Sequence, residues 1–305
     1  MQAQEYNDIM KEYRLLVEAR LGDIERSTAL TEGVGIYPTL RKAMFYSLEA
    51  GGKRLRPCLL LAVCELLGGD TDMALPIACG LEMIHTYSLI HDDLPCMDDD
   101  DFRRGKPSNH KVFGEAMAVL AGDGLLSLAF ETMLKGAEGL DGEALKNYLK
   151  AVNEVASRAG SGGMVSGQAA DIVYEGEHNQ TEEMLAYIHT HKTADMLCAA
   201  VLAGAYAAGA GDEMTAMLKI YAQKLGLLFQ ITDDVLDFQG EAAALGKTPG
   251  KDEASGKLTY ATLYGVEGAK QKARITADEA KAAVSDVKNN GLLLAVIDNI
   301  LYRSF

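Results

Sequence analysis

Apolar residues recur along this chain with the spacing of helices, and no segment alternates long enough to predict a strand. Glycine-rich gaps such as Gly51-Gly52, Gly68-Gly69 and Gly160–Gly163 separate the apolar runs. Most of the six prolines stand near the start of a run. The pattern therefore predicts an all-α chain. The expected helices are Leu40–Ala50, Leu59–Leu67, Ile77–Asp92, Glu115–Lys135, Glu143–Arg158, Met164–Tyr174, Thr181–His189, Ala194–Ala208, Glu213–Phe238, Leu258–Leu263, Val266–Asp286 and Leu292–Arg303.

Domain organisation and composition narrow the class of protein. No Pro/Ser-rich linker or low-complexity stretch divides the chain, so residues 1–305 are expected to form one domain. No run reaches ~18 uninterrupted apolar residues, and the charged start from Met1 to Arg20 does not resemble a signal peptide. Stable membrane insertion is therefore not expected. The five cysteines lack regular spacing, which favours free thiols and a cytoplasmic location. A net charge of −15 disfavours nucleic acid as a partner.

Two aspartate clusters each end a long apolar run. Carboxylates grouped in this way repel each other and are costly to desolvate unless a cation pairs with them. Mg²⁺ prefers oxygen ligands and shares its coordination shell with phosphates. The clusters therefore predict a site where several Mg²⁺ ions, or Mn²⁺ in their place, hold a diphosphate. The first cluster consists of Asp92, Asp93 and Asp98, and the second consists of Asp233, Asp234 and Asp237.

The two clusters differ in helical phase. Asp233 and Asp237 are related as i and i+4, so an α-helix places both on one face. The six residues from Asp92 to Asp98 turn through about 600°, and Pro95 disfavours a helical residue before it. We therefore expect the chain to bulge within this segment and to return Asp98 to the site.

Basic segments near both clusters provide local positive charge. Lys53 and Arg56 follow a glycine turn at an expected helix start, and helix N-termini attract phosphate. Arg103 and Arg104 follow the first cluster, and their guanidinium groups suit bidentate phosphate binding. The loop Gly246–Lys251 follows the second cluster, but it has neither the strand nor the glycine spacing of a P-loop. Each segment alone is also compatible with an ordinary solvated turn.

Several polar residues on apolar runs leave two interpretations open. His85 lies two helical turns before the first cluster on the same face, although such histidines are more often satisfied core residues. Lys192 needs a route to solvent or an anion. Gln168 and Asp171 are either polar core residues or part of a site.

Taken together and in this order, these motifs resemble those of the trans-isoprenyl diphosphate synthases, particularly the bacterial farnesyl type. The resemblance runs from about Tyr37 to the C-terminus. It implies an isoprenoid synthase-type bundle of about a dozen mostly antiparallel helices around a central cavity, usually in a homodimer. The motifs are Gly51–Pro57, His85–Gly105 with its two-residue insertion, Gly167–Asp171, Lys192-Thr193, Phe229-Gln230, Asp233–Asp237 and Gly246–Asp252.

The resemblance also implies a role for individual residues. The six clustered aspartates would bind Mg²⁺. Isopentenyl diphosphate would contact Lys53, Arg56, His85 and Arg104. The allylic diphosphate would contact Arg103, Lys192, Lys247 and Lys257. Polar groups near the reacting carbons would be Thr193, Gln230, Gln168 and Asp171.

The implied reaction joins isopentenyl diphosphate head-to-tail to dimethylallyl or geranyl diphosphate. Tyr87 and Ser88 lie about one helical turn before the first cluster, where the growing tail must pass. The bulky Tyr87 either packs the helix interface or forms a floor that stops elongation. An aromatic residue here, together with the inserted first aspartate motif, resembles farnesyl diphosphate synthases and implies a C15 product, farnesyl diphosphate. By the same resemblance, the role of a basic C-terminal tail in closing the site is doubtful, because Arg303 is the only cation near the end.

Four alternatives stay open at this point. A geranylgeranyl diphosphate synthase, or a synthase of mixed short products, would differ only in chain length. A terpene cyclase usually carries Asn and Ser in its second metal motif, where this chain has acids. His91-Asp92 matches the first pair of metal phosphohydrolases, but no further histidines are suitably spaced. A non-catalytic prenyltransferase subunit typically lacks one aspartate motif, and both are present here.

Overall fold

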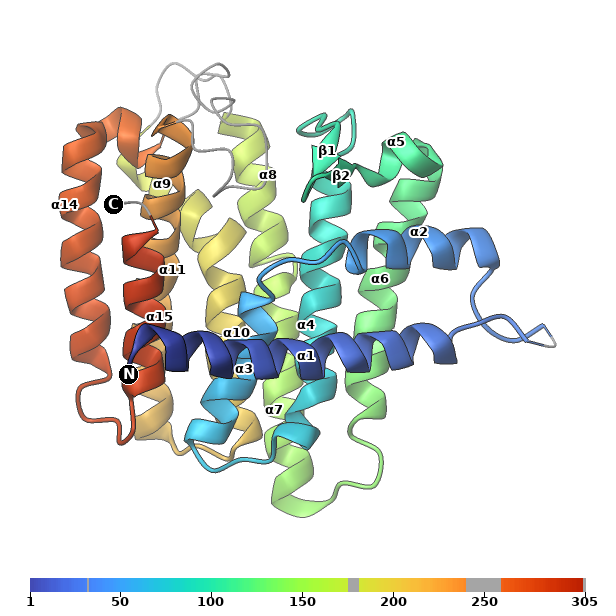
Figure 1. Ribbon diagram of the computed structural model, residues 1–305, viewed down its shortest axis with the longest axis horizontal. Coiled ribbons are helices and arrows are strands. Elements are labelled where there is room, and N and C mark those ends of the chain that lie inside the picture. Colours follow the sequence, from blue (N-terminus) through green and yellow to red (C-terminus); the bar gives the residue numbers. More distant parts are fainter. Residues whose placement is uncertain (32, 175–180, 240–258, 304–305) are drawn as a thin grey trace.

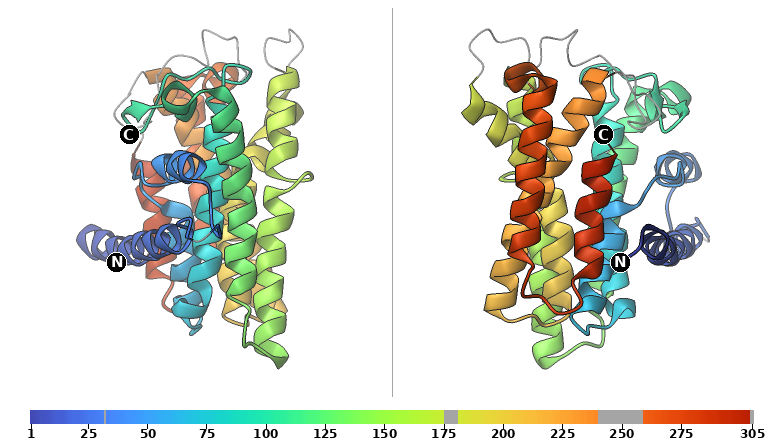
Figure 2. Two further views of the ribbon diagram at one scale, coloured as in Figure 1. Left: turned by 90° about the vertical axis from the view of Figure 1, so that its right-hand side faces the viewer. Right: turned by 60° about the vertical axis from the view of Figure 1, so that its left-hand side comes forward.

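The computed structural model describes residues 1–31, 33–174, 181–239 and 259–303. Long helices run side by side as a bundle, and α1 and α2 lie across one face of it (Figures 1 and 2). The predicted all-α class is confirmed. The elements are α1 Ala3–Ser27, α2 Pro38–Leu48, α3 Leu55–Leu66, α4 Thr71–Asp92, β1 Phe102–Arg103, β2 Lys106–Pro107, α5 Asn109–Phe113, α6 Glu115–Lys135, α7 Gly142–Ala159, α8 Met164–Tyr174, α9 Glu182–Ile188, the π-helix η1 His189–Ala194, α10 Asp195–Ala207, α11 Asp212–Gln239, α14 Tyr260–Ala283 and α15 Gly291–Tyr302.

Most predicted helices lie within a few residues of their observed bounds, and those of α6 and α8 coincide. The break predicted before Val266 is also confirmed, because Gly265 has a φ of 69° inside α14. Glycine adopts this left-handed region without the steric cost of a Cβ atom. Two short features were not predicted. The strands β1 and β2 pair antiparallel, but each has only two residues, too few to produce an alternating pattern.

The N-terminal helix α1 was absent from the prediction. It places Tyr6, Tyr13, Val17 and Leu21 on the buried side, at intervals of seven and four residues. This spacing is helical, but the charged residues between these positions obscure it. The apolar face of α1 packs against α3 and α4, so the segment expected to be merely charged forms part of the core.

The prediction ended one helix at His189 and began the next at Ala194, and this break is wrong. The chain continues through it as the π-helix η1, so α9, η1 and α10 form one helical stretch. Single π-turns inside α-helices often occur at functional sites, because they displace side chains from the regular helical phase. This turn contains Lys192 and Thr193.

Two helices among the described residues are long and apolar enough to cross a membrane by length and composition alone. In α4, 72% of the apolar window is buried, as in the core helix of a bundle. In α6 only 39% is buried, and Val119, Leu120 and Leu134 are exposed. All five cysteines are free thiols, as predicted, and Cys96 alone is exposed.

Candidate active site

The two aspartate clusters lie at the same end of the bundle. In the view of Figure 1, α4 and α11 both run upward and end near its upper edge. The first cluster begins at Asp92, the last residue of α4. The chain then leaves the helix, and the backbone N–H of Asp98 donates to the carbonyl of Asp92 at 2.9 Å. The predicted bulge is therefore confirmed, and it brings these two residues together across a tight loop.

Arg103 binds the first cluster directly. Its Nε donates to Asp93 Oδ1 at 2.9 Å, and its Nη2 donates to Asp100 Oδ2 at 3.2 Å. Burial raises the pKa of Asp93, and the hydrogen bond from Arg103 acts in the opposite direction. Arg103, expected to face an allylic diphosphate, thus compensates two buried carboxylates in this structure.

The second cluster has contacts from the C-terminal part of the chain. Asp234 Oδ2 accepts the backbone N–H of Tyr260 at 2.7 Å, and Arg303 Nη2 lies 2.7 Å from Asp233 Oδ1. The guanidinium of Arg303 also lies 4.1 Å from the centre of the Phe229 ring. Arg303, the only cation that the sequence shows near the end, reaches the second cluster because α15 packs against α11.

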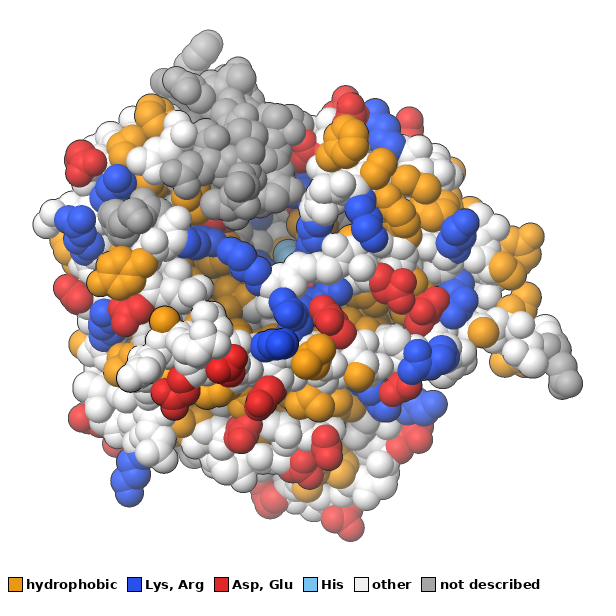
Figure 3. Space-filling view, in the orientation of Figure 1, with side chains coloured by type: hydrophobic (Ala, Val, Ile, Leu, Met, Phe, Trp, Pro, Cys, Tyr) orange, Lys and Arg blue, Asp and Glu red, His pale blue; other side chains and the backbone are white. Residues whose placement is uncertain are grey.

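A cavity of about 390 Å³ opens beside the first cluster. Its walls come from α3, α4, α8 and the helical stretch around η1. Figure 3 shows Lys and Arg side chains gathered around a hollow near the centre of one face. Apolar side chains such as Met164, Ile172 and Met196 form part of the lining. The predicted site residues among the lining are Arg56, His85, Tyr87, Ser88, Asp92, Gln168, Lys192 and Thr193.

The remaining predicted residues lie outside this lining. Asp171 is close to it, because its Oδ2 accepts from Lys192 Nζ at 2.5 Å. Lys53 is exposed at the start of α3. Arg104 lines a smaller neighbouring pocket and donates to the carbonyl of Gly51. The other predicted residues within the described part are Asp93, Asp98, Arg103, Gln230, Asp233, Asp234 and Asp237, whereas Lys247 and Lys257 lie outside the described residues.

The cavity has a cationic side and an acidic rim. Arg56 Nη1 lies 3.4 Å from His85 Nε2. Burial lowers the pKa of His85 well below its usual value, and Arg56 and Arg104 lower it further, so the ring is neutral at neutral pH. Burial also raises the pKa of Asp92 to about 6, with Asp98 acting in the same direction and Lys192 against it. A cation bound at this rim would favour the ionised carboxylates.

Glu82 is a residue that the sequence analysis did not single out. It is 1% exposed, and its Oε1 lies 2.7 Å from Arg54 Nη1 and 3.9 Å from Arg104 Nη2. Breaking a buried pair by removing one partner costs about 3–5 kcal/mol, so Glu82 holds this group of cations together. A lone acid within the apolar run Ala74–Ile90 was the available signal, because such a charge requires a buried partner.

The donors also fit a hard metal ion. The two clusters offer only carboxylate oxygens. Mg²⁺ prefers such ligands, whereas Zn²⁺ also favours nitrogen and sulfur. Within the described part of the cavity wall, Gln168 Oε1 is buried without a hydrogen-bond partner, so a polar group of a ligand would satisfy it. The acidic rim, the cationic side and the apolar walls of the cavity suit molecules with a phosphorylated head and an apolar tail.

The comparisons with known proteins agree with this class. The family model described as polyprenyl synthetase matches residues 37–291. The chain is 50% identical to the farnesyl diphosphate synthase of Geobacillus stearothermophilus over 260 residues, which is 85% of this chain and 86% of that protein. It is 47% identical to a chloroplastic geranylgeranyl pyrophosphate synthase of Catharanthus roseus over 266 residues, covering 87% and 74% of the two chains.

A solved structure gives the same result for the fold. An FPP/GFPP synthase from Zymomonas mobilis matches with a TM-score of 0.84 and 34% identity, covering 98% of this chain and 100% of that one. The predicted isoprenoid synthase-type fold is therefore confirmed. The chain belongs to the polyprenyl synthetase family and is a short-chain trans-prenyltransferase of isoprenoid biosynthesis.

Proposed function

We propose that this protein is a Mg²⁺-dependent farnesyl diphosphate synthase. It condenses isopentenyl diphosphate with dimethylallyl diphosphate, and then with geranyl diphosphate, releasing inorganic diphosphate at each step. The names of similar relatives include both farnesyl and geranylgeranyl synthases, so product length rests on this chain's own cavity. A geranylgeranyl or mixed short-chain synthase is the second candidate, and a non-catalytic subunit is less well supported because both aspartate clusters are intact.

The proposed site has two diphosphate-binding parts. Isopentenyl diphosphate binds beside Arg56 and neutral His85, with Lys53 and Arg104 contributing nearby. The allylic diphosphate binds between the aspartate clusters with Lys192, and with Arg103 once a metal ion has displaced its guanidinium group from Asp93. Lys247 and Lys257 belong to this second set by their place in the sequence. Thr193, Gln230, Gln168 and Asp171 surround the reacting carbons.

The bound Mg²⁺ ions would stabilise the negative charge that develops on the departing diphosphate. Lys192 adds positive charge on the same side, from a π-turn that directs it into the cavity lining. The double bond of isopentenyl diphosphate attacks the allylic C1, and a proton is lost to the released diphosphate. Apolar walls, including those from Met164 and Met196, keep water from the cationic carbon.

Tyr87 is the observation that carries the proposed C15 product. It is 7% exposed, lines the cavity, and lies five residues before Asp92 on α4, somewhat more than one turn below the cluster. Its ring meets His91 edge to face, with centroids 5.7 Å apart, so its position is held by packing. Ser88 beside it is small, and its hydroxyl donates to the carbonyl of His85. A fixed ring at this depth limits the length of a growing tail.

Replacing this ring should lengthen the product. Tyr87→Ala is expected to release mainly C20 or longer diphosphates, because the alanine opens the wall where the C15 tail would stop. The first condensation should slow much less, since Tyr87 does not touch the diphosphate end in this proposal. Incubation with labelled isopentenyl diphosphate, dimethylallyl diphosphate and Mg²⁺, followed by chromatography of the dephosphorylated products, measures both effects.

Tyr87→Phe is the matched control, because it keeps the ring and should keep the C15 product. Tyr37→Ala removes an exposed tyrosine and should also leave product length unchanged. If the Tyr87→Ala variant still makes the C15 product with near-normal activity, another residue limits the length of the product. If the unaltered protein makes C20 directly, the geranylgeranyl assignment replaces the farnesyl one.

We also propose that residues 1–305 act as one domain in a cytoplasmic homodimer. The packing of α1 against α3 and α4 supports one domain, and the free cysteines support a reducing compartment. The exposed apolar side chains of α6, Val119, Leu120 and Leu134, support a second copy as the partner of this helix. Sedimentation equilibrium should give the dimer mass, and a purely monomeric species at micromolar concentration would contradict it.

A further inference from the structure

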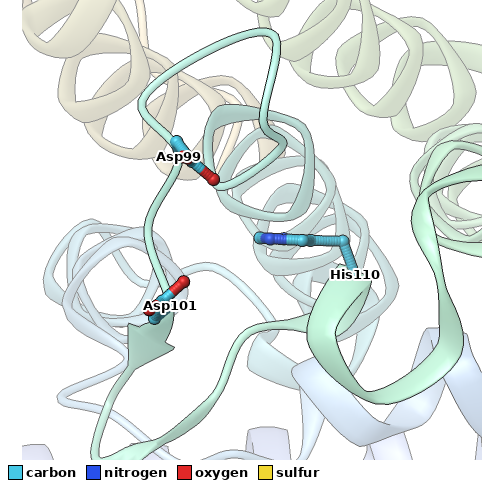
Figure 4. A group of neighbouring side chains, drawn as sticks. All are labelled: Asp99, Asp101 and His110. Atoms are coloured by element: carbon cyan, nitrogen blue, oxygen red, sulfur yellow. The ribbon is translucent and has the colours of Figure 1, made fainter.

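A second group of metal-ligand side chains lies beyond the first aspartate cluster. Asp99, Asp101 and His110 each offer one ligand atom, and these atoms all lie within 4.8 Å of one another. Figure 4 shows the two carboxylates and the imidazole directed toward a common space between the loop and α5. None of the three belongs to the clusters assigned above to diphosphate-bound Mg²⁺.

His110 is the observation that points to a ligand. Its side chain is 6% exposed, and its Nε2 is buried without a hydrogen-bond partner among the described residues. Its Nδ1 lies 3.2 Å from the hydroxyl of Ser108, which is itself buried. A histidine that ligates a metal through one nitrogen usually has the other held by a hydrogen bond, as Ser108 does here. An orphaned ring nitrogen beside two carboxylates is otherwise costly.

We propose that Asp99, Asp101 and His110 bind one transition-metal ion of the Zn²⁺ or Mn²⁺ type. Imidazole nitrogen is a good ligand for such ions, whereas Mg²⁺ favours oxygen ligands alone. Water would complete the coordination shell, because both aspartates are exposed. The site is independent of the proposed product length, and it would join the loop that carries Asp98 to α5.

Lys111 competes with the metal ion for this site. Its Nζ lies 2.6 Å from Asp101 Oδ1, with both side chains substantially exposed. Exposed ion pairs contribute little free energy, about 0–1 kcal/mol, so a divalent ion can displace the ammonium group. Removing Lys111 should therefore strengthen metal binding, an outcome that a purely structural role for the three ligands does not predict.

Isothermal titration with ZnCl₂ in millimolar Mg²⁺ tests the proposal, because Mg²⁺ occupies the oxygen-only clusters. One Zn²⁺ per chain should bind to the whole protein. Asp99→Asn and His110→Asn should each weaken binding roughly 10- to 100-fold. Lys111→Ala should tighten it, and Glu138→Gln, at an exposed acid in the turn after α6, should leave it unchanged. Circular dichroism checks that each variant is folded.

Anomalous scattering at the zinc edge locates the ion in crystals grown with both metals. A peak between Asp99 and His110 supports the site. A peak confined to Asp92 or Asp233 overturns it, as does Zn²⁺ binding that is unchanged in Asp99→Asn. If His110→Asn does not fold, Asp99→Asn alone decides, because Asp99 is exposed and its substitution removes only a ligand oxygen.

Discussion

Asp92→Asn and Asp233→Asn are each expected to lower kcat by roughly 100- to 1000-fold or more. Each substitution replaces a charged metal ligand with a neutral amide at one of the two clusters. The fold should survive, because burial already raises the pKa of Asp92 to about 6 and an amide relieves that desolvation. Asp233→Asn also removes the negative charge that pairs with Arg303, although the amide oxygen can still accept a hydrogen bond, so a modest shift in melting temperature is expected there. Steady-state kinetics and thermal unfolding measure both effects.

Asp278→Asn is the matched control, since it makes the same chemical change at an exposed aspartate of α14. It should leave kcat unchanged. Removal of metal by excess chelator should abolish turnover of the unaltered protein, and added Mg²⁺ should restore it. Full activity in chelator would exclude the metal-dependent mechanism, and near-normal activity of Asp92→Asn would remove the first cluster from it.

Arg56→Ala and Lys192→Ala should separate the two substrates. A hydrogen bond to a charged group contributes about 1.5–3 kcal/mol, which corresponds to roughly a 10- to 100-fold effect on apparent affinity. Arg56 lies beside neutral His85 within the cavity, so its loss should raise KM for isopentenyl diphosphate. Lys192 lies near the acidic rim and is paired with Asp171, so its loss should raise KM for the allylic substrate.

Each variant should change the KM of the other substrate by a few-fold at most. Lys146→Ala is a suitable control, because this exposed lysine pairs only with Glu143 on the surface of α7 among the contacts described. In Lys146→Ala, the KM values for isopentenyl diphosphate and for the allylic substrate should both stay unchanged. Equal weakening of both substrates in Arg56→Ala and in Lys192→Ala would mean that the two diphosphates share one cationic site.

Local patterns were sufficient for most of the helical framework. The helical phase of α11 and the loop after Asp92 follow from i, i+4 spacing and from Pro95, which act over a few residues. The bounds of α6 and α8 followed from uninterrupted apolar spacing in the same way. The helix α1 carried the same kind of signal, at Tyr6 and Tyr13 among others, but its many charges concealed it. Hydrophobic period alone therefore determined the all-α class.

The pairing of charges was decided by the tertiary structure. Glu82 and Arg54 are 28 residues apart, and Arg303 and Asp233 are still farther apart in the chain. The position of a charged residue in the sequence does not indicate its partner. Helix packing therefore determined which cation pairs with which carboxylate. The π-turn at Lys192 similarly depends on how η1 packs against α8 and α11.

The sequence by itself determined most of the helices, the two carboxylate clusters and the family resemblance, because spacing and residue type act locally. The tertiary structure decided which side chains share the cavity, how Arg103 and Arg303 compensate the clusters, and that His110 stands beside Asp99 and Asp101. These contacts join segments that are far apart in the sequence, so local spacing does not predict which of them meet. They depend on the packing of whole helices, which is a cooperative property of the folded chain.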